Sequence, residues 1–127
     1  MNIDELLAAA RARLTRVTAA EAWRSMAAGA VLVDIRADSQ MERDGTIPGA
    51  IVIPRNVLEW RADPACDYHD PRLGKRTGAL MLICAEGYQS SLAAATLHDL
   101  GITDATDVID GFDGWRQAGL PVDHSSN

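Results

Sequence analysis

The hydrophobic positions of the chain follow two alternating patterns. Predominantly apolar runs, each of strand length, are separated by longer segments in which apolar and polar residues mix as they do on helices. The runs predict strands at residues 31–36, 50–54, 79–84 and 105–110, with a further short strand around Arg16 and Val17. Strands that alternate with helices are typical of a parallel sheet covered by helices. The sequence therefore predicts an α/β fold.

Polar residues and glycines indicate where the helices begin and end. Four helices are expected, at residues 2–14, from the cap residue Thr18 to Met26, from the cap Ser90 or Ser91 to Gly101, and at 111–120. A short helical or turn segment through Gly45 and one or two helical turns at 56–61 fill the gaps, and 62–78 is expected to be a polar loop. Run 79–84 is apolar without alternation, as in a strand covered on both faces, so it is expected at the centre of the sheet.

Composition limits the kind of protein this is. The chain has 127 residues, 47% hydrophobic and 24% charged, which is enough for one globular domain with a core and too little for two. A formal net charge of -6 without a basic block argues against a nucleic-acid partner. The N-terminus carries its acids before its apolar residues, the reverse of a secretory signal, and no stretch approaches membrane-spanning length. We therefore expect a cytoplasmic protein with no membrane partner.

Two cysteines and three histidines are the residues that most often carry chemistry or bind metals. The histidines, at 69, 98 and 124, lack the spacing of metal ligands, so no metal site is expected. Cys66 lies in the predicted polar loop and is interpreted as an ordinary loop residue. Cys84 ends the central apolar run and precedes a loop and a helix, where a thiolate is stabilised by the helix N-terminus. Gly87, in that loop, can take the positive φ that lets backbone N–H groups converge on a bound anion.

Four motifs in order resemble the rhodanese-like sulfurtransferases. VLVDIR at 31–36 is similar to the family's strand ending in Asp-x-Arg, and GTIPGAIVIP at 45–54 to its Gly-His-Ile-Pro-Gly-Ala stretch, with Thr46 in place of the usual His. CAEGYQSS at 84–91 resembles the active-site loop, and GFDGWRQAGLPV at 111–122 the closing Gly-x-x-x-Trp-x-x-x-Gly-Leu-Pro-Val. The resemblance covers nearly the whole chain, from about Leu14 to Val122.

The resemblance implies a three-layer α/β/α domain with a five-stranded parallel sheet. It implies a helical extension at 1–14, the domain at 15–122 and a tail at 123–127. Cys84 would take sulfane sulfur from a small-molecule or protein-borne donor, as a persulfide, and pass it to a thiol or cyanide-like acceptor. No metal or organic cofactor is implied. The substrate-binding loop around the sulfur would be Ala85, Glu86, Gly87, Tyr88, Gln89 and Ser90.

Departures from the family's loop bear on the donor and on the alternatives. Gln89 stands where the family usually has arginine, and Glu86 adds a negative charge, so the loop offers little to the thiosulfate dianion. A persulfide or another thiol-borne donor is therefore expected. A related class of phosphatase needs arginine six residues after the cysteine, where this chain has Ser90. A non-catalytic binding or redox-sensing module, with an inert Cys84, is the other alternative.

A second polar pair is predicted to be structural. Asp34 and Arg36 come at the end of the first long apolar run, and we interpret them as an ion pair at a strand end rather than as substrate ligands.

Overall fold

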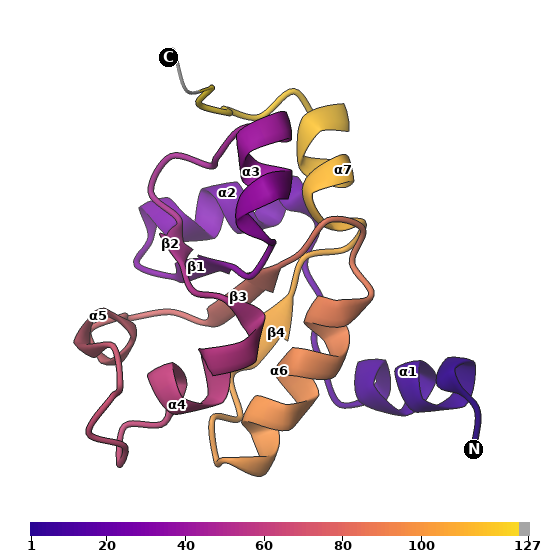
Figure 1. The fold of residues 1–127 in the computed structure, drawn as a ribbon, viewed down its shortest axis with the longest axis vertical. Coiled ribbons are helices and arrows are strands. Elements are labelled where there is room, and N and C mark those ends of the chain that lie inside the picture. Colours follow the sequence, from indigo (N-terminus) through magenta and orange to yellow (C-terminus); the bar gives the residue numbers. More distant parts are fainter. Residues whose placement is uncertain (125–127) are drawn as a thin grey trace.

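A parallel four-stranded sheet lies at the centre of the structure, a computed structural model that describes residues 1–124 (Figure 1). Its strands lie in the spatial order β2-β1-β3-β4, and every neighbouring pair is parallel. Their bounds are β1, Val31–Asp34; β2, Ile51–Val52; β3, Leu80–Ile83; and β4, Ala105–Asp107. The predicted α/β fold is confirmed, and β3, from the run at 79–84, is one of the two inner strands as predicted.

The expected fifth strand is reduced to a single bridge. Val17 pairs in parallel with Val108, its N–H donating to the Asp107 carbonyl at 3.1 Å, while its own carbonyl accepts from the Ile109 N–H at 2.8 Å. Pairing stops there because the next residue, Thr18, already caps a helix. The prediction of five strands was therefore wrong by this one short segment.

Within residues 1–124, seven α-helices connect and flank the strands. They are α1, Ile3–Ala12; α2, Ala19–Ala27; α3, Asp38–Asp44; α4, Leu58–Ala62, preceded by the 3-10 turn η1, Arg55–Val57; α5, Pro71–Gly74; α6, Gln89–Asp99; and α7, Gly111–Gln117. The predicted Thr18 cap is present, with the Thr18 hydroxyl accepting from the Glu21 N–H and the Glu21 carboxylate accepting from the Thr18 N–H.

The stretch 62–78 is not entirely the polar loop that was predicted. Helix α5 interrupts it, because the Asp70 side chain accepts from the Arg72 N–H at 2.9 Å and Pro71 fits the first helical position. The apolar residue of that turn, Leu73, is 2% exposed and packs into the core. The polar residues around Leu73 in the sequence thus gave no indication that this one side chain is buried in the core.

The helices form layers on both faces of the sheet, as predicted (Figure 1). Along β3 the side chains alternate: Leu80 and Leu82 pack on the side of α4, α5 and α6, whereas Met81 and Ile83 pack on the side of α2 and α7. Cys84 continues this alternation and belongs to the core on the α6 side. The register of one strand therefore fixes which layer the cysteine faces.

Helix α1 packs outside these layers, against α6 (Figure 1). Ala10 is its buried residue, and an exposed ion pair between Arg13 and Asp99, 2.7 Å apart, links the two helices. At the other end, Asp123 and Thr46 exchange two backbone hydrogen bonds, so the segment assigned to a tail begins on the body of the domain. The rest of that tail, 125–127, lies outside the described residues, and the boundaries at 14 and 122 stay predictions.

Candidate functional site

Cys84 lies directly after β3, at the sheet edge where the carboxyl ends of the strands meet. Its residue is 5% exposed, and its Sγ accepts two backbone hydrogen bonds, from the Gly87 N–H at 3.2 Å and from the Ser90 N–H at 3.4 Å. Both donors belong to the loop and helix start that the sequence predicted to surround the sulfur. Amide groups that converge in this way favour a negatively charged sulfur at their centre.

The loop depends on the backbone of Gly87. This residue has φ +88°, and a Cβ placed on it would lie 2.9 Å from the Asp110 N, which caps α7, and 3.2 Å from the N of Gly111, the first residue of α7. Only glycine therefore fits both the conformation and the space. Of the other loop residues, Ala85 is half-buried, whereas Glu86, Tyr88 and Gln89 are exposed.

Helix α6 begins without the serine cap that was expected. Its cap residue is Tyr88, whose side chain makes no capping bond, and Ser90 and Ser91 lie in the first turn, fully buried. The Cys84 sulfur takes the role of a cap, because it accepts the hydrogen bond of an N–H that has no partner within the helix. The Ser90 and Ser91 hydroxyls therefore do not cap the helix and make other hydrogen bonds.

That network connects the thiol to a buried carboxylate, Asp107, at the end of β4. The Ser90 hydroxyl donates to Asp107 Oδ2 at 2.7 Å, and the Cys84 thiol donates to the Ser90 Oγ at 3.3 Å. Asp107 also accepts from the Ser91 hydroxyl at 2.8 Å and pairs with Arg16 at 2.8 Å. Asp107 therefore keeps partners if the Ser90 hydroxyl turns to donate to a Cys84 thiolate instead.

Sequence reasoning missed Asp107, Ser91 and two arginines. Asp107 was assigned to a strand and received no role, although a polar residue at the carboxyl end of β4, next to β3, lies at the edge where sites form in parallel sheets. Arg11 and Arg16 both donate to the Gly87 carbonyl, at 2.8 and 3.1 Å. Nothing in the sequence pattern indicated that these N-terminal side chains reach the loop.

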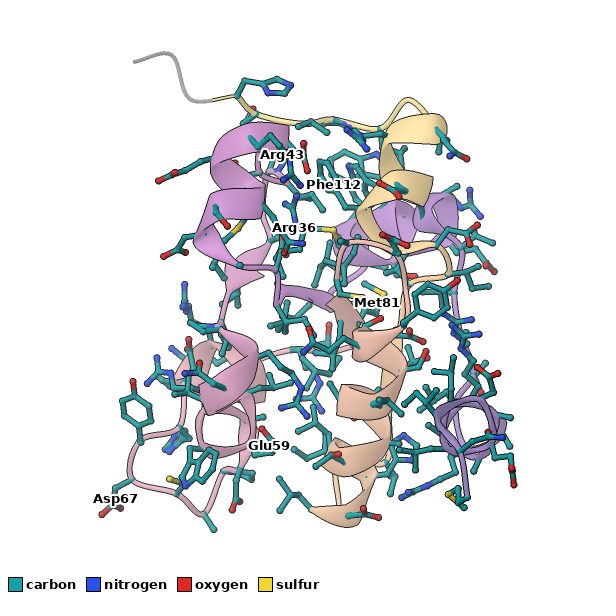
Figure 2. The ribbon with its side chains drawn as sticks, turned by 45° about the vertical axis from the view of Figure 1, so that its right-hand side comes forward. Arg36, Arg43, Glu59, Asp67, Met81 and Phe112 are labelled. Atoms are coloured by element: carbon teal, nitrogen blue, oxygen red, sulfur yellow. The ribbon has the colours of Figure 1, made fainter. Side chains whose placement is uncertain are left out.

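The predicted ion pair of Asp34 and Arg36 is present and buried. Arg36 Nη2 lies 2.7 Å from Asp34 Oδ2 and 2.9 Å from the Gly45 carbonyl, and its guanidinium lies over the Phe112 ring, 3.8 Å from the centroid. Figure 2 labels Arg36 and Phe112, which lie close together near α3 and α7. These contacts join β1, α7 and the segment before β2, which is the structural role expected.

A pocket of about 350 Å³ adjoins the loop at Gln89. Residues after β1 and β2 complete its lining, among them Arg36, Asp38, Arg55 and Asn56. Both arginines of this lining have carboxylate partners: Asp34 binds Arg36, and Glu59 lies 2.8 Å from Arg55. The pocket is large enough for a small molecule beside the loop. Both guanidiniums in its lining are already paired with carboxylates of the protein.

The remaining expectations concern metals, Cys66 and membranes. Within residues 1–124, no group of three or more histidine, cysteine, aspartate or glutamate side chains is arranged to hold a metal ion. Cys66 is a half-buried free cysteine, and its carbonyl contacts the His69 ring at 2.6 Å. None of the helices in the described part of the chain is both long and apolar enough to span a membrane.

Comparison with known proteins identifies the family. The sequence profile of the rhodanese-like domain matches residues 18–118, and the chain belongs to this family. A thiosulfate sulfurtransferase GlpE from Haemophilus influenzae is 28% identical over 107 residues, which cover 84% of this chain and 92% of the relative.

Solved structures agree on the fold. A Rhodopseudomonas palustris protein of unknown function, described as a possible tyrosine phosphatase, superposes with a TM-score of 0.87 at 35% identity, covering 97% of this chain and 95% of its own. A thiosulfate sulfurtransferase from Pseudomonas aeruginosa superposes with a TM-score of 0.69 at 21% identity, covering 88% of this chain and 20% of its own. The fold class predicted from the four motifs is therefore confirmed.

Proposed function

We propose that this protein is a sulfurtransferase that carries sulfane sulfur as a persulfide on Cys84. The observation that supports this most is the pair of backbone N–H groups, from Gly87 and Ser90, that donate to the Cys84 Sγ at the start of α6. Such donors stabilise the Cys84 thiolate before it attacks the donor and again when it leaves in the second half of the reaction. Membership of the rhodanese-like family supports the same reaction class.

The reaction has two halves, each a displacement at sulfur. In the first, the Cys84 thiolate attacks the sulfane sulfur of the donor and forms a new S–S bond. The bond between that sulfur and the leaving group breaks, and its electron pair stays on the leaving group. The leaving group is sulfite when the donor is thiosulfate and a thiolate when the donor is a persulfide. In the second, cyanide or a thiolate attacks the outer sulfur and the Cys84 thiolate returns. One neutral sulfur atom moves, so no oxidant or reductant is required.

The donor we propose is a persulfide or another thiol-borne sulfur rather than thiosulfate. Glu86 and Gln89 are exposed on the loop, and both arginines in the lining of the adjoining pocket are paired with carboxylates. A dianion would therefore meet the exposed Glu86 carboxylate on the loop and no unpaired guanidinium in the pocket lining. The name of the Haemophilus influenzae relative makes thiosulfate the first donor for comparison.

The test is a panel of sulfur donors with cyanide as acceptor, measured as thiocyanate release. Wild type and Cys66→Ser are expected to turn over, whereas Cys84→Ser is expected to be inactive, because Cys84 alone lies at the converging amides. A persulfide donor should give a higher kcat/KM than thiosulfate. Equal losses in the two cysteine variants would point to a dithiol relay, and turnover that survives Cys84→Ser would refute the proposal.

A further inference from the structure

Two arginines that precede the segment matched by the rhodanese-like profile donate hydrogen bonds to the loop that follows Cys84. The match begins at residue 18, yet Arg11 of α1 and Arg16 both direct Nη2 at the Gly87 carbonyl, at 2.8 and 3.1 Å. We propose that Arg11 is a positioning residue of the sulfur site, which orients the loop peptides so that their N–H groups face Cys84. This inference rests on the proposed function for its effect on sulfur transfer, but not for its effect on the loop.

The two peptide units that meet at the Gly87 Cα explain how the arginines act. The described backbone contains no cis peptide bond, so the carbonyl of Gly87 and the N–H of Tyr88 point in opposite directions across a planar unit. Fixing the carbonyl on the guanidiniums therefore turns the Tyr88 N–H away from them. On the other side of the same residue, the Gly87 N–H donates to the Cys84 Sγ. A glycine permits such a peptide to rotate, and the two arginines oppose that rotation.

Arg11 also connects the loop to the first turn of α6. Its Nε donates to the Ser91 Oγ at 3.1 Å, and its guanidinium lies 5.6 Å from the centroid of the exposed Tyr88 ring. The planar guanidinium thus contacts the loop carbonyl, the helix start and an aromatic face at once. The lysine ammonium carries its three N–H donors on one nitrogen, so it cannot reproduce the first two contacts with the same geometry.

The charge of Arg11 distinguishes it from Arg16. Arg16 is neutralised by the buried carboxylate of Asp107, 2.8 Å away. Arg11 forms no ion pair with a carboxylate within residues 1–124, so its full charge acts on the loop carbonyl. The loop has Gln89 where the family usually has arginine. Helix α1 thereby supplies a cation, the Arg11 guanidinium, which binds the loop through the Gly87 carbonyl.

The test compares Arg11→Met and Arg11→Lys with Arg13→Met. Arg13 is the matched control, because it is the C-cap residue of the same helix and links α1 to α6 through Asp99 without contacting the loop. Two quantities are measured: the single-turnover rate of sulfur acceptance at saturating donor, and hydrogen exchange of the Gly87 and Ser90 amides. Arg11→Met is expected to slow acceptance and to speed exchange at both amides by about five-fold each, the size expected when one hydrogen bond of ordinary net strength is lost from a partly exposed site. Arg11→Lys should recover part of both, and Arg13→Met should change neither.

The two readouts separate failure of the inference from failure of the function. If Arg11→Met and Arg13→Met behave alike in loop exchange and in acceptance, the positioning role is refuted. If wild type accepts sulfur from no donor, the proposed function fails, and loop exchange alone then decides the role of Arg11. An increase in exchange throughout the domain would show that Arg11 acts on global stability, which also refutes the inference.

Discussion

Replacing Gly87 with alanine tests whether the site loop depends on one close backbone approach. Gly101 provides a matched comparison, because both glycines have nearly the same φ, +88° and +86°. A Cβ on Gly101 has nothing within 4 Å, whereas a Cβ on Gly87 lies 2.9 Å from the Asp110 N. The two substitutions therefore impose the same conformational cost, and only Gly87→Ala adds a backbone collision.

The magnitudes follow from these two terms. A left-handed conformation costs an L-residue about 1 kcal/mol, which is the whole effect expected for Gly101→Ala. Gly87→Ala must also displace the turn before α7, and a misfit of this kind costs about 1 to 3 kcal/mol more. In a domain of 127 residues each kcal/mol lowers Tm by about 4 °C, so we expect a loss of about 4 °C for Gly101→Ala and about 10 °C for Gly87→Ala.

Calorimetric unfolding and sulfur acceptance together complete the test. The Gly87 N–H donates to the Cys84 Sγ, so the Gly87→Ala protein, measured well below its Tm, should accept sulfur about ten-fold more slowly, the cost of losing or misplacing one such donor. Gly101→Ala should accept sulfur at the wild-type rate. Equal Tm losses for the two variants, or unchanged acceptance in Gly87→Ala, would show that the approach of Gly87 to Asp110 does not shape the site.

Three further outcomes follow from side chains of the site and the core. Gln89→Arg should raise kcat/KM for thiosulfate several-fold, and adding Glu86→Ala should raise it further, since each exposed charge contributes about 1 kcal/mol. Both gains should be smaller in high salt, and unchanged turnover in steady-state assays would show that loop charge does not determine the choice of donor. The Arg72 side chain lowers the pKa of buried Asp70 from 3.8 to about 2, so its stabilisation is complete above pH 4 and lost as pH falls towards 2. Asp70→Asn should cost about 1 to 2 kcal/mol in urea unfolding at pH 7 and nothing near pH 2, whereas a cost independent of pH would contradict this assignment. Hydrolysis of aryl phosphates should be absent, because Ser90 stands where a phosphatase of this fold needs arginine; phosphate release that depends on Cys84 would reverse that conclusion.

Strand and helix types could be predicted because local patterns determine them here. The unalternating apolar run of β3 marks a strand covered on both faces, and the polar cap at Thr18 marks a helix start. Trp115, in the closing motif, is fully buried, with its Nε1 donating to the Pro121 carbonyl at 2.8 Å. In each case a residue and its near neighbours in sequence carry the information.

The predictions failed where partners distant in sequence decide the structure. Ser90 and Ser91 fit the pattern of helix caps, but the sulfur of Cys84 accepts the free N–H and the buried Asp107 binds both hydroxyls. Arg11 reaches a carbonyl 76 residues away, which no periodicity encodes. The fold and the position of the candidate nucleophile could thus be inferred from the sequence, whereas the contacts made by Cys84 and its loop required the structure.

The central claim is that Cys84 carries sulfane sulfur, and the intact mass of the protein after exposure to donors tests it most directly. Wild type should gain the mass of one sulfur atom from at least one persulfide or thiosulfate donor and lose it on addition of cyanide or thiol. Cys66→Ser should behave as wild type, and Cys84→Ser should gain nothing. A wild-type mass that stays unchanged with every donor, or a gain that persists in Cys84→Ser, would contradict the claim.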